Sequence, residues 1–257
     1  MGEPAIRVEG LSVAYGRRRA LEEVGFSLPR GAMLGVVGPN GGGKSTLVKA
    51  LLGLVPATGR AELLGRRVDR AARRLVGYVP QREEVNWNFP LSALDVVLMG
   101  RVPSLKLLRS YGEGDRRLAR EALETVGMEH HAGTRIRELS GGQQQRVFMA
   151  RALAQEAEIL LLDEPVSGVD APSQHEIFDL LHRLQAAGKT IVVTTHDLSC
   201  VAERFDSALL LNRRLVALGP PAEVFTKELL DEAYQSHLML LDVDGRTVAV
   251  EKGVRGG

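Results

Sequence analysis

A glycine-rich segment near the amino terminus has the residue types and the spacing to bind phosphate. It consists of Gly38, Pro39, Asn40, Gly41, Gly42, Gly43, Lys44, Ser45 and Thr46. This run fits the pattern G-x-x-x-x-G-K-[ST], in which glycines let backbone N–H groups converge on phosphate oxygens. The ammonium of Lys44 can reach the β- and γ-phosphates of a nucleotide, and the hydroxyl of Ser45 is the expected Mg²⁺ ligand. An apolar run precedes the segment and a helical pattern follows it, so the sequence predicts a phosphate-binding loop.

Two adjacent carboxylates follow a second apolar run. Residues 159–162 are all apolar, and Asp163 and Glu164 come directly after them. Because adjacent side chains of a strand point to opposite faces, the two acids can have different roles. We expect Asp163 to hold the Mg²⁺ shell, through water, and Glu164 to orient or deprotonate an attacking water. A strand that ends in a polar turn is common, and it is the phosphate loop that makes this pair a candidate for catalysis.

A second glycine-rich turn, residues 139–143, lies between the phosphate loop and the acidic strand. It opens a helix of its own, so it too can bind an anion. A nucleotide that contacts both turns would be held from two sides, and one chain cannot easily supply both contacts. The two turns together therefore predict that a nucleotide closes a dimer.

Two further polar residues lie where strands end. His196 follows an expected strand at 190–195, and ligands of α/β folds gather at the carboxyl ends of parallel strands. We therefore expect His196 to contact the γ-phosphate, although a lone histidine is more often structural. Gln81 stands at the junction between the first strands and a helical block, and taken alone it indicates nothing.

The elements that must position these residues follow from hydrophobic periodicity. Alternation of Ile6 and Val8 with Arg7 and Glu9 indicates a half-buried edge strand. The other expected strands are 33–37, 75–79, 159–162 and 190–195, and the expected helices are 45–52, 92–99, 115–126, 143–154 and 171–187. This order predicts an α/β core at 1–81 and 156–222, a helical subdomain at 82–155, and a small carboxy-terminal extension at 223–257.

Composition excludes several classes of protein. The 257 residues are 44% hydrophobic and 25% charged, which is ordinary for a soluble globular chain. A net charge of +1 argues against binding nucleic acid through a large basic field. The single cysteine, Cys200, rules out an internal disulfide. We expect no signal peptide and no spanning helix, so the chain should be cytosolic or docked on a membrane through a partner.

These motifs in this order resemble the ATP-binding cassette (ABC) family over about residues 5–225. The resemblance implies a P-loop NTPase core with an antiparallel β edge subdomain and an inserted helical subdomain. It implies that Tyr15 stacks on adenine, with a core tyrosine as the alternative. It also implies that Gln81 contacts Mg²⁺ and the attacking water. By the same resemblance Asp170 belongs to the D-loop and His196 is the switch histidine. The residues implied to face the γ-phosphate of the opposite subunit are Ser140, Gly141, Gly142 and Gln143. Two mild departures exist, Gly42 and the pair Gly168-Val169.

Residues 80–90, 95–101 and 164–172 resemble, more narrowly, ATPase subunits of manganese, zinc and iron importers. The resemblance implies an integral-membrane permease partner, an external substrate-binding protein and a position at the cytoplasmic face of the membrane. Trp87 and Phe89 are the expected permease contacts, because paired aromatics in a polar loop make good interface anchors. The alternative is that these two side chains pack in the core of the helical block.

Other functions remain open on the same residues. A soluble ABC ATPase of the iron–sulfur assembly, repair or translation type would share the ATP site, and so would an importer subunit for another cargo. The second glycine turn argues against a P-loop kinase, and no Asn-Lys-x-Asp motif supports a GTPase. One helix face carries His175, Asp179 and His182 at a spacing that could bind a metal ion. That face should be solvated, so we expect no protein metal site there. ATP with Mg²⁺ is the only cofactor expected.

Overall fold

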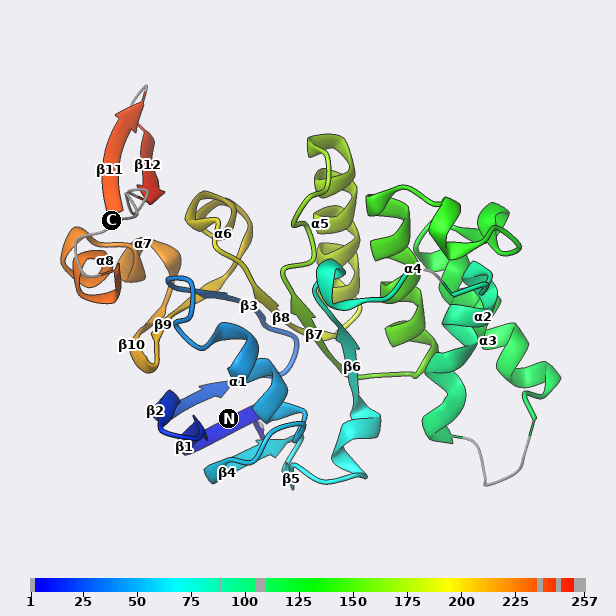
Figure 1. Cartoon of the computed structure of the whole chain (residues 1–257), viewed down its shortest axis with the longest axis horizontal. Helices are drawn as coiled ribbons and strands as arrows, with labels where there is room; N and C mark the ends of the chain where they lie inside the picture. The colour runs from blue at the N-terminus through cyan, green and yellow to red at the C-terminus, as the bar shows by residue number, and fades with distance from the viewer. Residues whose placement is uncertain (1–2, 88, 105–109, 235–237, 244–245, 252–257) are drawn as a thin grey trace. The chain divides into compact units, whose positions relative to one another are not determined.

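The computed structural model describes residues 3–87, 89–104, 110–234, 238–243 and 246–251. The chain divides into two compact units, residues 1–67 with 192–257 and residues 68–191 (Figure 1). Within the described ranges, no helix combines the length and the apolar character needed to cross a membrane.

An antiparallel sheet with strand order β2-β1-β4-β5 lies in the first unit. Its strands are β1 (Ile6–Tyr15), β2 (Arg18–Leu28), β4 (Thr58–Leu63) and β5 (Arg66–Arg67). Ile6 and Val8 are buried while Arg7 and Glu9 are exposed, so the alternation seen in the sequence does mark a strand with one covered face. The expected antiparallel β edge is confirmed.

Parallel strands in the first unit carry the phosphate loop. β3 (Met33–Val37) pairs in parallel with β9 (Ser207–Asn212), and β10 (Arg214–Gly219) pairs antiparallel with β9. All five residues of β3 are buried, as a central strand requires. The loop after β3 leads into α1 (Lys44–Leu51), and α6 (Leu198–Arg204) follows β8 (Thr190–Thr194).

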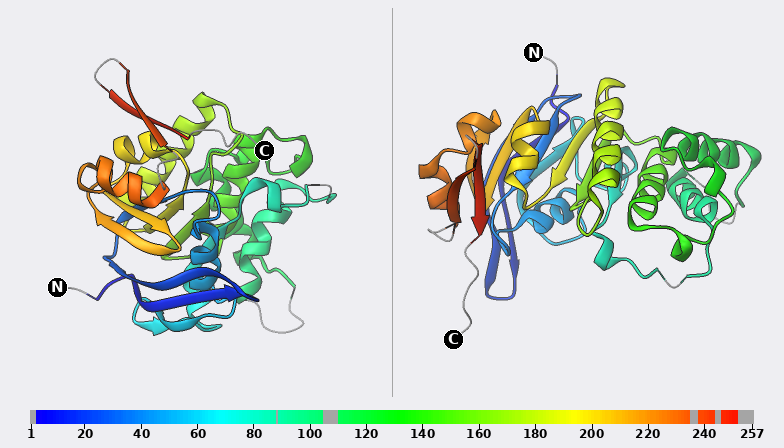
Figure 2. Two further views of the ribbon diagram at one scale, coloured as in Figure 1. Left: turned by 60° about the vertical axis from the view of Figure 1, so that its left-hand side comes forward. Right: turned by 90° about the horizontal axis from the view of Figure 1, so that it is seen from above.

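The carboxy-terminal segment adds two helices and a hairpin to the first unit. They are α7 (Pro221–Val224), α8 (Lys227–Tyr234), β11 (Leu238–Val243) and β12 (Arg246–Glu251). The side-chain amide of Asn212 donates to the carbonyl of Ala233 at 2.8 Å, which fastens α8 to β9. Figure 2 shows β11 and β12 as red ribbons, and the two strands pair antiparallel as a hairpin.

The second unit combines a parallel strand pair with a group of helices. β6 (Val76–Val79) pairs in parallel with β7 (Ile159–Asp163). The α-helices are α2 (Ala93–Leu98), α3 (Glu113–Thr125), α4 (Gly141–Ala154) and α5 (Ala171–Ala186). The 3₁₀ turns are η1 (Ala72–Leu75), η2 (Arg82–Glu84), η3 (Met99–Ser104), η4 (Glu129–His131) and η5 (Ile136–Glu138). Helices α2, α3 and α4 pack against one another, as both Figures 1 and 2 show.

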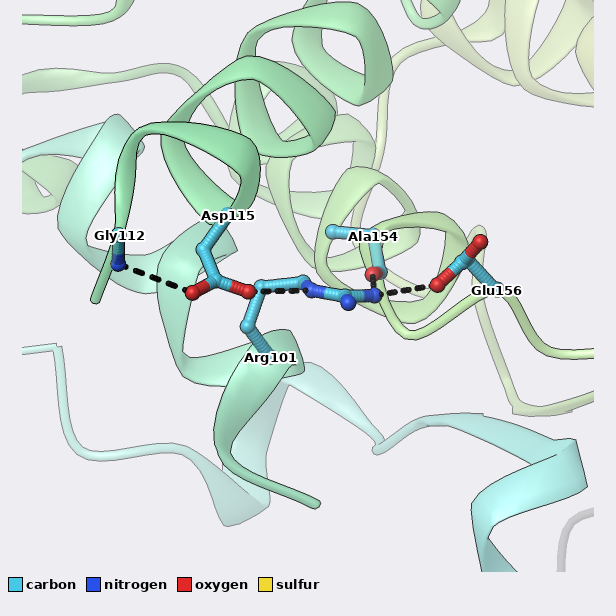
Figure 3. Close-up of polar contacts among 5 residues, drawn as sticks. All are labelled: Arg101, Gly112, Asp115, Ala154 and Glu156. Atoms are coloured by element: carbon cyan, nitrogen blue, oxygen red, sulfur yellow. Dashed lines mark hydrogen bonds and ion pairs between the residues drawn. The ribbon is translucent and has the colours of Figure 1, made fainter. Parts of the chain in front are cut away.

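A buried arginine joins three elements of this helical group (Figure 3). Arg101 in η3 donates through Nε to Asp115 Oδ1 at 3.1 Å, and through Nη1 to the Ala154 carbonyl at 2.6 Å and to Glu156 Oε2 at 2.8 Å. Asp115 also accepts from the backbone N–H of Gly112 at 3.0 Å, which caps α3. The side chain of Arg101 is only 9% exposed. It therefore fastens the start of α3 and the end of α4 to η3.

The elements expected from periodicity are all present, with ends shifted by at most two residues, as in α3 at Glu113–Thr125 against 115–126. The expected helical residues 82–155 lie within the second unit. The domain boundaries drawn from the sequence stay predictions.

Candidate functional site

The phosphate loop holds its lysine with its own backbone. Lys44 is the first residue of α1 and is 7% exposed. Its Nζ donates to the carbonyl of Gly38 at 2.8 Å and to that of Pro39 at 3.2 Å. A buried ammonium needs such acceptors. They hold the ammonium at the loop, beside a helix start that favours anions.

Two glycines of the loop are required by a neighbouring backbone. Gly38 has φ of +151°, and a Cβ there would lie 1.9 Å from the carbonyl oxygen of Leu211. A Cβ on Gly42 would lie 2.9 Å from that same oxygen and 2.9 Å from the carbonyl oxygen of Pro39. Gly42, one of the two departures noted in the sequence, thus has a cause in this chain: β9 approaches the loop too closely for a side chain.

Tyr15 and Arg18 flank the hairpin turn that joins β1 to β2. Tyr15 ends β1, Arg18 begins β2, and the two residues are paired across the strands. Tyr15 is 49% exposed, so the alternative of a core tyrosine is wrong. A guanidinium nitrogen of Arg18 would lie 3.2 Å from a Cβ built on Gly41, which brings its positive charge beside the phosphate loop. The sequence analysis did not single out Arg18, although it is only three residues from Tyr15.

His196 leaves the sheet next to the strand that leads into the phosphate loop. Strands β8 and β3 are neighbours, and the Thr195 N–H donates to the Val36 carbonyl at 3.0 Å. His196 itself is exposed. The next residue, Asp197, caps α6 by accepting from the Cys200 N–H at 2.9 Å. In the first unit, therefore, the phosphate loop and His196 both follow neighbouring strands.

The paired carboxylates in the second unit differ in environment. Asp163 ends β7 and is fully buried, whereas Glu164 is partly exposed. Glu164 has φ of 45°, a left-handed conformation that costs roughly 1–3 kcal/mol for such a residue and is found at functional sites. Tyr78 lies on the partner strand β6. Burial first, and the charge of Asp163 second, raise the pKa of the Tyr78 hydroxyl above its ordinary value, so it stays protonated.

Gln81 follows β6 and precedes η2. It is partly exposed, and its backbone carbonyl accepts from the Glu84 N–H at 3.1 Å. The next residue, Arg82, donates through Nε to Gln144 Oε1 at 3.2 Å, in the first turn of α4. Sequence reasoning missed Arg82, because nothing in a sequence signals a contact between residues 62 positions apart.

The second glycine turn is built as a capping box at the start of α4. The Ser140 hydroxyl accepts from the Gln143 N–H at 3.3 Å, and Gln143 Oε1 accepts from the Ser140 N–H at 2.9 Å. This reciprocal pair fixes the turn. The amide nitrogen of Gln143 also lies 3.4 Å from Nε2 of His131. No acidic residue lies in the first turn of α4, so its N–H groups keep their positive potential.

Gly142 and the D-loop segment approach each other closely. Asp170 is the N-cap of α5, where its carboxylate accepts from the Ser173 N–H at 3.3 Å. A Cβ on Gly142 would lie 2.7 Å from Cβ of Ser173 and 3.5 Å from Cγ1 of Val169. The structure therefore brings Asp170 and the second glycine turn together within the second unit.

Trp87 and Phe89 differ in exposure. Trp87 is partly buried, its Nε1 donates to the Arg82 carbonyl at 2.9 Å, and its ring packs on Phe148 with 5.2 Å between centroids. For Trp87 the alternative of packing within the helical group is confirmed. Phe89 is 55% exposed and stays available for a partner.

The candidate residues are divided between the two units. The first unit holds Tyr15, the phosphate loop and His196, and the second holds Gln81, the two carboxylates, the second glycine turn and Asp170. Among the described residues no group of three or more His, Cys, Asp and Glu side chains could hold a metal ion by itself.

A phosphate loop between a buried strand and a helix, an acidic strand end and a second capped glycine turn define a P-loop nucleoside triphosphatase with an inserted helical group. The family model described as ABC transporter matches residues 21–167, more than half of the sequence. The chain belongs to the ABC transporter family.

Several known proteins are similar over most of their length. The manganese transport system ATP-binding protein MntB of Halalkalibacterium halodurans is 48% identical over 91% of this chain and 94% of that protein. The zinc transport system ATP-binding protein TroB of Treponema pallidum is 47% identical over 90% of this chain and 86% of that protein. The solved dimeric structure of MJ0796, a bacterial ABC transporter cassette, has a TM-score of 0.72 and 30% identity, covering 84% of this chain and 98% of that one.

Proposed function

We propose that this chain is the ATP-hydrolysing subunit of an importer for a divalent transition-metal cation: manganese, zinc or iron. One observation carries the proposal: a full set of nucleotide motifs stands in a chain 47–48% identical to ATP-binding proteins of manganese and zinc transport systems.

ATP with Mg²⁺ is the proposed nucleotide. Lys44 neutralises the β- and γ-phosphates, the backbone of residues 38–46 surrounds them, and Tyr15 stacks on adenine. Two carbonyls already hold the Lys44 ammonium at the loop, which supports its role. Mg²⁺ is assigned to Ser45, Gln81 and Asp163, whose hydroxyl, amide and carboxylate oxygens are the hard ligands this ion prefers. When bound, the ion neutralises charge on the phosphate oxygens.

Glu164 is the proposed general base. Its carboxylate accepts a proton from the water that attacks the γ-phosphate, while Gln81 orients that water and His196 contacts the γ-phosphate. Partial exposure leaves the Glu164 carboxylate accessible to water, whereas full burial suits Asp163 to the ion. The left-handed backbone of Glu164 supports a functional reason for its position.

A head-to-tail dimer completes the proposed site. The signature turn, residues 139–143, contacts the γ-phosphate held by the phosphate loop of the second copy, and Asp170 lies at the same interface. The capped helix start without acidic residues supports an anion-binding role for the turn. The dimeric state of the similar cassette MJ0796 supports the two-chain arrangement.

An integral-membrane permease is the proposed partner, contacted near Trp87 and Phe89, with Phe89 as the exposed member of the pair. The chain then acts at the cytoplasmic face of the membrane, and an external substrate-binding protein delivers the cation to the permease. ATP closes the dimer, closure moves the permease contact, and hydrolysis reopens the dimer.

Metal uptake tests the cargo. A strain that lacks the chain should lose uptake of at least one of the three cations, and the wild-type chain should restore it while Lys44→Ala should not. Unchanged uptake of all three would contradict metal import. Co-purification of a polytopic membrane protein with the tagged chain separates a transporter subunit from a soluble ABC ATPase.

The role of Glu164 has its own test. Glu164→Gln should bind ATP, hydrolyse it at least about 100-fold more slowly and accumulate as a dimer on gel filtration. Glu121→Gln, on an exposed position of α3, is the matched control and should turn over ATP normally. Unimpaired hydrolysis by Glu164→Gln would remove Glu164 from the role of base.

A further inference from the structure

A buried glutamine of α4 carries a side-chain amide that the proposed mechanism does not use. Gln145 is 3% exposed, and its Nε2 has no hydrogen-bond partner among the residues that the structure describes. The neighbouring Gln144 is 4% exposed, yet its amide accepts from Arg82 Nε at 3.2 Å and donates to the Ile136 carbonyl at 3.0 Å. A buried donor without an acceptor is costly, so such groups are rare and need an explanation. The Gln145 amide is therefore a candidate for a contact made during the reaction.

The side chain of Gln145 leans over the two signature glycines. Gly141 and Gly142 precede it by four and three residues, and a helical side chain points back toward these positions. A Cβ on Gly141 would lie 3.4 to 3.6 Å from the Arg82 guanidinium, and a Cβ on Gly142 would lie 3.5 Å from Cγ1 of Val169. The Gln145 side chain therefore lies between Arg82, which follows β6, and Val169, which ends the turn after β7.

The turn 164–169, between β7 and α5, is held from its other side by a second glutamine. Gln174 of α5 donates through Nε2 to the Val169 carbonyl at 2.8 Å and to the Val166 carbonyl at 3.4 Å. The turn begins at Glu164, whose left-handed backbone persists only where the surrounding structure holds it. Since each carbonyl oxygen has two lone pairs, it can accept a second donor. The turn can therefore accept from Gln145 on the α4 side as it accepts from Gln174 on the α5 side.

We propose that Gln145 is a positioning residue for the carboxylate of Glu164. In the arrangement that hydrolyses ATP, Gln145 Nε2 donates to a carbonyl of the turn 164–169, so that glutamines from α4 and α5 hold the turn from both sides. The new bond satisfies the buried donor, and this gain favours the reactive orientation of Glu164. This inference rests on the role of base assigned to Glu164 in the proposed function, and it adds the side chain that holds this base in place.

Gln145→Met, in the full chain, tests the proposal because stability and activity should change in different directions. Methionine keeps the length of the side chain and a high helix propensity, but it has no N–H to donate. The variant should melt at the wild-type temperature or above it, because a buried donor without an acceptor has been removed. Its kcat for ATP hydrolysis should nevertheless fall about tenfold, the effect of one lost hydrogen bond in the transition state.

The KM for ATP separates positioning of the base from binding of the nucleotide. Because Gln145 acts on Glu164, Gln145→Met should lower kcat and leave KM within about twofold of the wild-type value. Two neighbouring positions supply matched controls. Gln144→Met removes an amide that has both its partners, so it should lower the melting temperature. Met149→Leu, one turn further along the same face, conserves volume at a buried site and should keep the wild-type melting temperature and kcat.

Three results would overturn the role of Gln145. They are a wild-type kcat in Gln145→Met, a melting temperature of this variant as low as that of Gln144→Met, and an equal loss of kcat in Met149→Leu. A wild-type chain without ATPase activity, or unimpaired hydrolysis by Glu164→Gln, would contradict the proposed function and this inference with it. The wild-type and Glu164→Gln rates therefore separate a failure of the proposed function from a failure of Gln145 alone.

Discussion

Alanine substitution at the two adjacent signature glycines should have opposite effects on stability. A Cβ on Gly142 would lie 2.7 Å from Cβ and 2.8 Å from Oγ of Ser173, far below the 3.5–4.0 Å of an ordinary contact. Relieving this overlap requires α4 and α5 to separate, at a cost of about 1–3 kcal/mol. For a chain of this size, Gly142→Ala should lower the melting temperature by roughly 2–12 °C.

Gly141→Ala is the matched control. The nearest atoms to a Cβ there belong to the Arg82 guanidinium, at 3.4 to 3.6 Å, which is an ordinary contact. This variant should melt at the wild-type temperature or slightly above it, since alanine is the better helix former. The double variant Gly142→Ala/Ser173→Gly removes both atoms of the clash and should recover most of the lost stability.

Function should not follow stability in these variants. ATP hydrolysis and ATP-driven dimer formation should be lost in Gly141→Ala, in Gly142→Ala and in the stability-rescued double variant, because in the proposed dimer each methyl group would stand where the second copy's γ-phosphate approaches. Melting curves and ATPase rates on the same samples decide the matter. Recovery of ATPase activity together with stability in the double variant would mean that Gly142 serves internal packing alone. A wild-type melting temperature for Gly142→Ala would refute the steric argument.

The buried hydrogen bonds of Arg101 should matter to stability: Arg101→Ala should cost about 1–3 kcal/mol and lower the melting temperature by roughly 2–12 °C, and an unchanged melting curve would contradict a stabilising role of these bonds. Burial, with the charge of Asp197, raises the pKa of the Cys200 thiol to about 12. At pH 8 iodoacetamide should therefore alkylate the folded chain roughly 1000 times more slowly than the unfolded chain, and equal rates would refute the shift. Arg18→Ala should weaken ATP binding about fivefold in a titration, as loss of a solvent-exposed charge contact of about 1 kcal/mol implies. Arg19 is the next residue of β2 and points to the opposite face of the strand, so Arg19→Ala should leave ATP binding unchanged. Equal effects of the two substitutions would mean that Arg18 acts only through its contribution to the overall positive charge.

Elements with strong local signals could be predicted from the sequence. The apolar runs became the buried strands β3 and β7, because only a central strand covers every side chain. The cap of α4 could have been predicted in the same way, since Ser140 and Gln143 have the spacing of a capping box, although we expected only a glycine-rich turn there. Local rules of this kind fix an element without reference to the rest of the chain.

Contacts between distant residues could not be predicted. Arg101 finds Asp115 and Glu156 only after η3, α3 and the end of α4 have packed, and no single-sequence pattern contains that information. The same limit explains Trp87, whose aromatic side chain fitted either a partner surface or the helical group. Only its contacts with Arg82 and Phe148 distinguish the two.

The charges near the start of α4 destabilise this helix in the isolated chain. Helices α2 and α3 each carry an acidic residue in the first turn, which complements the helix dipole, whereas α4 carries none and has the Arg82 guanidinium beside Gly141. A positive group at a helix start is unfavourable by about 0.3–1 kcal/mol. Nor does packing demand glycine at 141, where a methyl group would fit. Both features favour an anion that comes from outside this chain and approaches the turn closely, as the γ-phosphate of ATP bound to a second copy would.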